Sequence, residues 1–427
     1  MIEYILLFLF LLYILLLVYL HYNSPFWFYQ PVYHTFTIYP KTFGYWSTPY
    51  IIKNIQKIKP NLFCDFVHIQ TAFYSDIDAL QKQQMLDLLQ SHCLDTEEFL
   101  YDITIHVLDT HLNGQKFPTI VSFYFPETVE EHRNPKKHFL LKPKLEKTPI
   151  ACFTTNQQYI WFPQFKNDIT KKPLQFPIYK WDYICVHRDY KEKHISRNMI
   201  QTHLYNQYKL SPIEACIFKK DVVLCKDIVP LVLYDTYTFF IQKTPISKLP
   251  IGYKIKRIEA RTINAWVELY TQIPYYHWDV CLLPSLSNTL QCIEKETHYV
   301  ILLIKVVDGQ ETVKGGYIFK DQYTVWDNTN MSQTNSKRTI QCVSSICLDV
   351  SATLYFFRGF LHSIKELYYQ KKDYGVLTIE QNSHNDIILE RWKEKYSMHM
   401  KTPTAYYLYN MVYPKGPVPG RSFFTFD

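Results

Sequence analysis

Residues 182–196 read Asp-Tyr-Ile-Cys-Val-His-Arg-Asp-Tyr-Lys-Glu-Lys-His-Ile-Ser, and they are the best guide to the architecture. They continue an apolar run over 179–187, which predicts a buried strand. An amphipathic helix is expected over about 195–208, and a further strand over 214–219. The basic turn lies where the helix begins, and free backbone N–H groups at a helix start favour an anion. The stretch therefore predicts a strand–turn–helix–strand unit with an anion cradle.

A second stretch of the chain repeats this order of elements. The pattern predicts a hairpin of strands 298–307 and 315–319 around Asp308-Gly309, strands over 339–350 and 375–379, a helix over 354–370, a helix beginning at Ser383 or Asn385, and a strand over 405–413. Two copies of one unit imply two related halves joined near 230–260. One mixed α/β domain without internal relation explains the same pattern.

Two aromatic motifs lie near the ends of the chain. Residues 26–32 read Phe-Trp-Phe-Tyr-Gln-Pro-Val, and residues 406–410 read Tyr-Tyr-Leu-Tyr-Asn, 17 residues before the C-terminus. Together with 182–196, they resemble the protein N-myristoyltransferases, which carry FWxTQPV, then FLCVHK-x-x-RSKRLAPVLI, then YYLYN. The order and the approximate spacing agree. The resemblance covers most of residues 26–427 in outline, but only a minority of positions closely.

This resemblance implies a particular fold and division of the chain. We expect an α/β fold with a mixed sheet, made of two fused GNAT-type acyltransferase halves. The first half, 23–235, would bind acyl-CoA, and the second, 236–427, would bind an acceptor peptide. Residues 1–22 would precede both halves as a transmembrane anchor.

The resemblance also implies acyl-CoA, specifically myristoyl-CoA, as co-substrate. Lys191, Lys193 and His194 match family positions for basic or polar contacts with the coenzyme A pyrophosphate. The residues expected to bind acyl-CoA are Phe26, Trp27, Gln30, Pro31, Val32, Cys185, Val186, Lys191, Lys193, His194, Ile195 and Ser196.

For catalysis, the resemblance assigns the oxyanion hole to the backbone N–H groups of Tyr183 and Ile184, in a segment where Asp182 replaces the family's Asn. Such donors contribute about 3 kcal/mol each to transition-state stabilisation. The chain's terminal carboxylate, on Asp427, would be the general base, and the apolar tail 421–427 is expected to be buried. Cys185 is not expected to be a nucleophile, because no histidine base is evident.

The acceptor would be a protein or peptide with an N-terminal glycine, and this side departs further from the family. The resemblance assigns acceptor contacts to Tyr407, Tyr409, Asn410 and Asn382. The family's Gly-rich stretch before YYLYN is replaced by 396–401, and its AAYSFYN strand by 345–350. Two alternatives follow: transfer to a different amine, or an inactive homologue that binds acyl-CoA or acylated protein.

Charge and cysteine content narrow the ligands. The net charge is +7, and residues 24–427 carry +8 because Glu3 is the only charged residue before them. This modest excess suits coenzyme A or an anionic membrane surface, and no nucleic-acid motif is present. The ten cysteines show no CxxC pair or metal-ligand spacing. We expect reduced, largely buried thiols in a cytosol-facing domain, and no metal.

The N-terminus predicts a membrane anchor. Residues 4–20 form an uncharged apolar run of 17 residues, close to the minimum for crossing a bilayer. A cleaved signal peptide is less consistent, because the run lacks a preceding basic residue and a small-residue cleavage site. A buried core helix is the third alternative. Lysines at 41, 53, 57 and 59 favour a single-pass protein with its catalytic domain in the cytoplasm.

Overall fold

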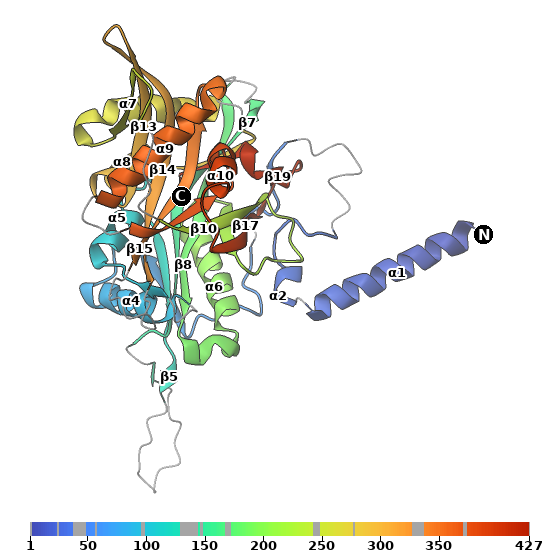
Figure 1. The fold of residues 1–427 in the computed structure, drawn as a ribbon. Helices are drawn as coiled ribbons and strands as arrows, with labels where there is room; N and C mark the ends of the chain where they lie inside the picture. The colour runs from blue at the N-terminus through green and yellow to red at the C-terminus, as the bar shows by residue number, and fades with distance from the viewer. Residues whose placement is uncertain are drawn as a thin grey trace.

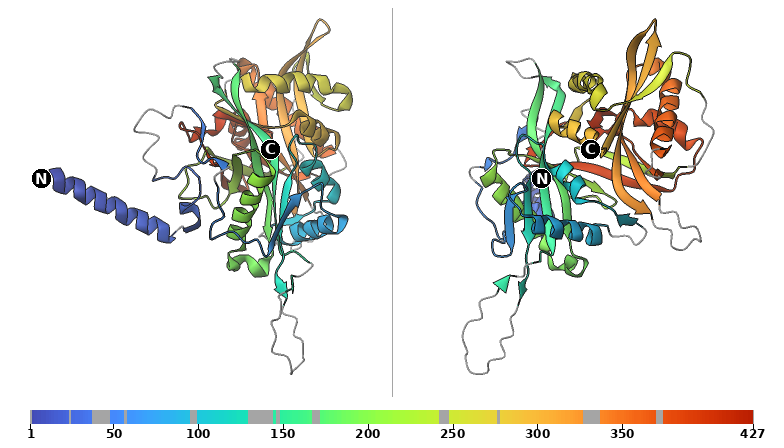
Figure 2. Two further views of the ribbon diagram at one scale, coloured as in Figure 1. Left: turned by 180° about the vertical axis from the view of Figure 1, so that it is seen from behind. Right: turned by 90° about the vertical axis from the view of Figure 1, so that its left-hand side faces the viewer.

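The computed structural model describes residues 2–23, 25–36, 48–55, 58–94, 99–128, 144–145, 148–166, 172–241, 248–275, 278–326, 337–369 and 374–426. Helix α1 (Ile2–Asn23) projects from a body built on one large mixed sheet, with helices packed against it (Figures 1 and 2). The expected α/β fold with one apolar N-terminal helix is confirmed. Asp427, the expected source of the general base, lies outside the described residues.

Helices and strands follow one another in nearly the same order in the two halves. The first half contains β2 (Ile69–Phe73), α4 (Ala79–His92), β3 (Phe99–Tyr101), α5 (Ile105–Leu112), β4 (Ile120–Tyr124), β7 (Ala151–Lys166), β8 (Pro173–Val186), α6 (Ile195–Leu210), β9 (Cys216–Asp221) and β10 (Val232–Phe240). The second half contains β11 (Tyr253–Arg257), α7 (Ile263–Gln272), β12 (Val280–Pro284), α8 (Leu286–Glu294), β13 (His298–Val307), β14 (Gln310–Trp326), β15 (Lys337–Cys347), α9 (Thr353–Tyr369), β16 (Tyr374–Glu380), α10 (Asn385–Lys393) and β17 (Met400–Tyr409).

Equivalent connections join equivalent strands in the two halves. Strands β7 and β8 form an antiparallel pair, and α6 then crosses to the parallel strand β9. Strands β14 and β15 are likewise antiparallel, and α9 crosses to the parallel strand β16. The predicted duplication is therefore present in the topology.

The two halves exchange strands. Along the main sheet the order is β11-β13-β14-β15-β16-β10-β17-β9-β8-β7-β12, and the short strand β20 (Phe423–Thr425) follows β12. Strand β10 pairs with β16 of the second half, while β17 pairs with β9 of the first. The exchange is repeated by β3, which pairs with β14, and by β12, which pairs with β7. The chain therefore cannot be divided at one point into two halves that each keep all of their strand pairs.

Most predicted elements match the structure, with extended ends. Helix α9 buries Phe357, Leu361 and Ile364 of the apolar face that the sequence indicated, whereas Leu354 of that face is 42% exposed. Strands β8 and β17 begin earlier than predicted, at Pro173 and Met400, because both continue pairing along the neighbouring strands β7 and β10.

Helix α1 is long and apolar enough to cross a membrane. Its window Ile2–Tyr19 has a mean hydropathy of 2.6 and is 0% buried. The alternative of a core helix is therefore excluded. A single residue separates α1 from the short helix α2 (Pro25–Phe28), whose Phe26 lies in the core of the first half.

The described residues also form short strands and 3-10 helices. They are β1 (Tyr50–Ile51), β5 (Glu127–Thr128), β6 (Lys144–Leu145), η2 (Arg188–Lys193), η3 (Ala260–Thr262), η4 (Ile273–Tyr275), η5 (Val350–Ala352), β18 (Met411–Val412), β19 (Val418–Pro419) and η6 (Gly420–Ser422).

Candidate active site

The parallel strands β8 and β9 separate soon after they meet. Only residues 179–180 of β8 pair with residues 216–217 of β9. Beyond them, the rings of Trp181 and Phe218 stack with their centroids 4.5 Å apart. A strand edge without a neighbour offers backbone donors and acceptors to an extended ligand. The divergence therefore creates a place where a chain such as pantetheine fits.

A β-bulge interrupts β8 at the end of this divergence. Residues 183–184 oppose the single residue Phe153 of β7. Tyr183 adopts a φ of 32°, a strained conformation for a residue with a side chain. Its N–H lies 3.2 Å from Oδ1 of Asp182 rather than in the sheet ladder. The two N–H groups expected to form an oxyanion hole thus belong to an irregular segment, where a bulge frees backbone groups.

The basic turn joins β8 to α6. It forms η2, and α6 begins at Ile195 as predicted. His194 has a φ of 59°, which turns the chain into the helix. Lys191 and His194 are exposed, and Ser196 is half-buried, whereas nothing is described of the Lys193 side chain. The Arg197 N–H in the first turn of α6 donates to the His194 carbonyl at 3.1 Å. The N–H groups at 195 and 196 precede this first bond, which gives the turn the form of an anion site.

The segment 26–32 packs against the strands that diverge. Phe26 is buried, and Trp27 stacks on Phe218 at 5.7 Å. Gln30 is buried as well, and its amide donates to the Phe26 carbonyl at 3.2 Å. Val32 forms an isolated bridge with Tyr409. The motif therefore lies in the half that contains the bulge and the basic turn, where the resemblance predicted it.

The YYLYN motif holds this segment in place. The Tyr409 hydroxyl donates to Gln30 Oε1 at 2.6 Å, and the Asn410 N–H donates to the Pro31 carbonyl at 2.7 Å. Tyr407 stacks on Phe218 at 5.2 Å. The structure thus places Tyr407, Tyr409 and Asn410 among the residues expected to bind acyl-CoA. Their expected contact with an acceptor stays a prediction. The location itself follows from the exchange of β17 into the first half.

A cavity of about 600 Å³ lies beside this motif. It is lined by Tyr29, Gln30, Pro31, Lys53, Asn54, Ile58, Lys59, Asn61, Leu62, Phe63, Gln201, Tyr208 and Tyr409. The Gln201 side chain is buried, and its Oε1 has no hydrogen-bond partner. The cavity therefore combines apolar walls with lysines and an unpaired buried acceptor.

Two further cavities meet at the bulge. One of about 430 Å³ is lined by both halves and includes Asp182, Tyr183, Lys219 and Asp321. A smaller one of about 30 Å³ includes His111, Asp182, His298 and Phe426. Asp182 and His111 line both, so the bulge borders a larger cleft and a small chamber.

Two histidines that stay uncharged line the small chamber. Nδ1 of His111 lies 2.7 Å from the Tyr183 hydroxyl. Burial lowers the pKa of His111 to about 4 and holds the pKa of His298 well below its ordinary value. Both imidazoles are therefore uncharged near neutral pH. Nε2 of each ring is buried without a protein partner, and a chamber of this size has room for water.

The chain end passes back into the core, as predicted. Strand β20 pairs in parallel with β12, and the Phe426 N–H donates to the Leu282 carbonyl at 3.2 Å. Phe426 is 1% exposed and stacks on His298 at 5.0 Å. The expected burial of the tail is thus confirmed for residues 423–426, which end at the wall of the small chamber, whereas Arg421 is exposed.

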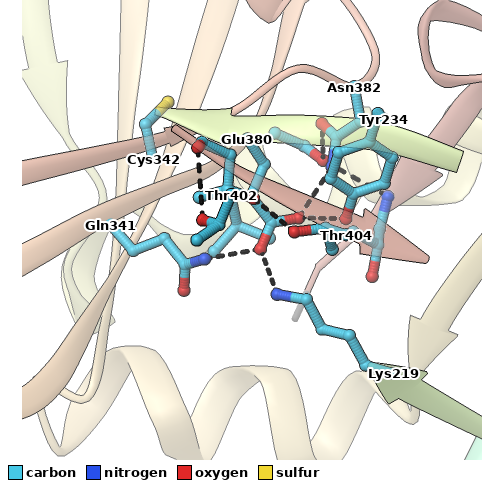
Figure 3. A network of polar contacts seen from close by, with 12 residues as sticks. Lys219, Tyr234, Gln341, Cys342, Glu380, Asn382, Thr402 and Thr404 are labelled. Atoms are coloured by element: carbon cyan, nitrogen blue, oxygen red, sulfur yellow. Dashed lines mark hydrogen bonds and ion pairs between the residues drawn. The ribbon is translucent and has the colours of Figure 1, made fainter. Parts of the chain in front are cut away.

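A buried carboxylate joins strands of both halves (Figure 3). Glu380 is 0% exposed, and Lys219 donates to its Oε1 at 2.6 Å. Gln341, Tyr234 and Asn382 also donate to this carboxylate. Asn382, an expected acceptor-binding residue, is itself fully buried and belongs to this network. Asn382 is therefore linked to the cleft only through Glu380, whose partners Lys219 and Gln341 line it.

The cysteine predicted to be inert has an environment consistent with that prediction. The Cys185 Sγ lies 3.5 Å from the Leu88 carbonyl, in the core with Val186. A hydrogen bond with Cys93 and burial both raise the pKa of the Cys185 thiol. A raised thiol pKa disfavours the thiolate, which is the nucleophilic form.

The duplicated sheet, the diverging strands and the bulge together define the double acyltransferase fold of GNAT type. More particularly, the chain has the fold of the N-myristoyltransferases. It is similar to the Saccharomyces cerevisiae N-myristoyltransferase with bound myristoyl-CoA, with a TM-score of 0.67 and 12% identity, over 93% of this chain and 94% of that chain. A structure of the yeast enzyme with bound myristoyl-CoA and inhibitors gives 0.66 and 12%, over 93% and 92%. The sequence matches no protein-family model and no curated protein.

Three features of the site were not predicted from the sequence. They are the acidic side chain of Asp182 at the bulge, the neutral pair His111 and His298, and the Glu380 network. A carboxylate one position before the expected oxyanion donors was a signal available in the sequence. The histidines and Glu380 gave no such signal, because the partners that bury them are distant along the chain.

Proposed function

We propose that this chain is a membrane-anchored N-acyltransferase that moves a long-chain acyl group, myristoyl, from coenzyme A to the N-terminal glycine amine of proteins. One observation carries the proposal: a bulged strand leaves the sheet beside an anion-binding helix start, in a fold whose solved relative holds myristoyl-CoA. Acyl-CoA is the ligand whose phosphates, extended pantetheine and thioester match these three features.

Binding would use the first half. The pyrophosphate lies on the η2 turn and the first turn of α6, where Lys191 adds positive charge. Pantetheine follows the gap between β8 and β9. The segment 26–32 closes this half from the anchor side, with Trp27 on Phe218.

The chemistry would take place at the bulge. The N–H groups of Tyr183 and Ile184 bind the thioester oxygen as it becomes an oxyanion, which is worth about 3 kcal/mol per donor. The terminal carboxylate acts as a base for the acceptor amine. The buried position of Phe426 at the chamber that Asp182 also lines supports this role for the residue that follows it. The acceptor enters through the cleft of about 430 Å³.

The anchor would be α1, retained in the mature protein. Its exposed apolar surface and its direct connection to the buried helix α2 support an uncleaved span. The catalytic body would face the cytoplasm.

A single experiment tests the function. The full chain, purified in detergent, is analysed for bound acyl-CoA by mass spectrometry and then assayed for transfer from myristoyl-CoA to Gly-initiated peptides. Replacement of Lys191 and Lys193 by Glu should weaken acyl-CoA binding at least tenfold, while Lys365→Glu, on the exposed face of α9, should not. Transfer to no peptide despite tight binding would contradict the enzyme and favour an acyl-CoA binding module.

One observation favours that second candidate. The Asp182 carboxylate accepts from the Tyr183 N–H that catalysis requires. A permanent anion at this place would oppose an oxyanion. Bound acyl-CoA without turnover, in both the wild type and Asp182→Asn, would identify the chain as a binding module.

A further inference from the structure

An exposed apolar surface surrounds the mouth of the 600 Å³ cavity. Leu62 is 84% exposed, Val67 62%, and Phe66 and Tyr29 50% each. Tyr29 and Leu62 line the cavity together with Lys53 and Lys59. Phe66 packs on Tyr205 of α6, the helix that also provides Gln201 and Tyr208 to this cavity. We name these four apolar residues with the two lysines the anchor-side surface.

The anchor ends at this surface. His21, in the last turn of α1, packs edge-on against Phe28 and Tyr29, both with ring centroids at 5.4 Å. Lys53 and Lys59 are exposed, and the nearby Asp65 turns its carboxylate to His68 at 2.8 Å. Aromatic side chains flanked by lysines are typical of protein surfaces that enter the headgroup region of an anionic bilayer.

We propose that the anchor-side surface docks on the leaflet from which α1 emerges, so that the cavity opens against anionic lipid. The proposal rests on α1 being an anchor, as proposed above. Because α1 already holds the body near the bilayer, even a weak surface contact is populated at the high local lipid concentration. An acyl-CoA in the leaflet then reaches the segment 26–32 without crossing water.

Photo-crosslinking of the full chain in nanodiscs tests this contact. Benzoylphenylalanine replaces Leu62 or Val67, with Leu12 in α1 as the positive control. Ile251 and Val307 are matched controls, because they are 102% and 52% exposed but lie in the second half. In phosphatidylserine nanodiscs, lipid adducts at 62 and 67 should exceed those at the controls at least tenfold, and Lys53→Glu with Lys59→Glu should reduce them.

The outcomes separate the proposal from its premise. Adducts at 12 but only control levels at 62 and 67 would overturn docking while leaving the anchor intact. Absence of adducts at 12 would overturn both, because no membrane-embedded helix would then be present.

A different observation concerns Asp182. Its side chain is 24% exposed and lines both the larger cleft and the small chamber, and Lys180 Nζ lies 4.0 Å from its Oδ2. Oδ1 accepts from the Tyr183 N–H at 3.2 Å, and Oδ2 accepts from Asn156 Nδ2 at 3.1 Å. A carboxylate so close to an oxyanion donor repels the oxyanion for as long as it stays charged. A proton received by this carboxylate as the oxyanion forms would remove the repulsion.

We infer that Asp182 takes a proton from the acceptor amine, a step that rests on the proposed acyl transfer. The amine nitrogen attacks the thioester carbon, and the C=O electron pair moves to oxygen, bound by the N–H groups at 183–184. The nitrogen becomes more acidic as the C–N bond forms, and its proton passes to the Asp182 carboxylate. When the C–S bond breaks, the thiolate of coenzyme A takes that proton from Asp182. Before the attack, the terminal carboxylate takes one proton from the acceptor ammonium and leaves a neutral amine with its lone pair. As the C–S bond breaks, the electron pair of the oxyanion re-forms the C=O bond.

Substitutions in the full chain test this role. Asp182→Asn should lower kcat about 100-fold, the scale for a positioned proton acceptor, with acyl-CoA affinity changed less than twofold. Asp182→Glu should keep part of the activity, and formate should restore part of it to Asp182→Ala. Asp308→Asn, in the exposed β13–β14 turn, is the matched control.

Two results would count against the inference in different ways. An Asp182→Asn variant as fast as the wild type, or faster, would show that the carboxylate merely occupies the Tyr183 N–H. A wild type that transfers nothing would instead overturn the proposed function, and the inference with it.

Discussion

Replacement of Lys219 by Met should destabilise the junction between the halves strongly. Lys219 lies on β9 and Glu380 on β16, with β17 and β10 between them in the sheet. Without the ammonium, the buried carboxylate keeps only the neutral donors of Figure 3. Breaking a buried pair on one side costs about 3–5 kcal/mol. Because the Lys219 side chain is 23% exposed, we expect about 3 kcal/mol.

The complementary change should cost less. Glu380→Gln leaves the ammonium of Lys219, which can turn toward the cleft it lines, so we expect about 1–2 kcal/mol. The double variant should cost less than the sum of the two, because the second change removes a charge already without its partner. Burial alone would lower the pKa of Lys219, but the carboxylates of Asp221 and Glu380 outweigh it and raise the pKa. The loss of unfolding free energy caused by Lys219→Met should therefore be the same at pH 6 and pH 8.

Urea unfolding of the full chain in detergent, followed by tryptophan fluorescence, measures these values. With an m-value of about 3 kcal/mol/M, a loss of 3 kcal/mol lowers the midpoint by about 1 M. Lys401→Met is the matched control, because Lys401 pairs with Asp235 at 2.9 Å with side chains 48% and 32% exposed, and an exposed pair is worth about 0.5 kcal/mol. Equal losses in Lys219→Met and Lys401→Met would refute the reasoning.

Three further predictions follow from the tail, the buried histidines and the anchor. Deleting residues 426–427, or adding two residues after Asp427, should lower turnover about 100-fold with nearly unchanged acyl-CoA binding. The effect of Asp427→Asn on turnover should be milder. An inactive Asp427→Asn variant beside an active extended chain would place the base on the side chain. Burial lowers the pKa of His203 to about 3 and those of His111 and His384 to about 4, so the unfolded chain takes up protons that the folded protein does not. Stability should therefore fall as the pH drops from about 6.5 to 4, by up to about 4 kcal/mol per unit for three groups, and a pH-independent midpoint in urea would disprove it. Alkaline carbonate should leave the chain in the membrane pellet, and added protease should digest the body in intact microsomes; protection there would place the body in the lumen.

Local pattern predicted those parts of the fold that depend on neighbours in sequence. The apolar run before residue 188 and the basic turn after it predicted β8, η2 and the start of α6. The spacing of apolar residues over 354–370 predicted α9 for the same reason. The three aromatic and basic motifs indicated the fold through a resemblance, and their joint position in the first half agrees with the acyl-CoA role proposed for it.

The remainder depends on contacts that no local pattern encodes. Nothing in the residues around Tyr409 indicates a distant partner, yet its hydroxyl donates to Gln30, 379 positions earlier. The YYLYN motif lies in the first half only because β17 pairs with β9, and no local pattern indicates that pairing. Burial of Glu380 and of His203 was equally hidden, because their partners come from other strands or helices.

The exchange of β10 and β17 has a consequence for how the protein is made. The first half cannot complete its sheet until β17 reaches β9. At ribosomal rates of about 5–20 residues per second, the 379 positions between Gln30 and Tyr409 take roughly 20–75 s to synthesise. During that time the first half lacks the strand that pairs with β9. Only chains synthesised beyond Tyr409 can complete this half of the sheet.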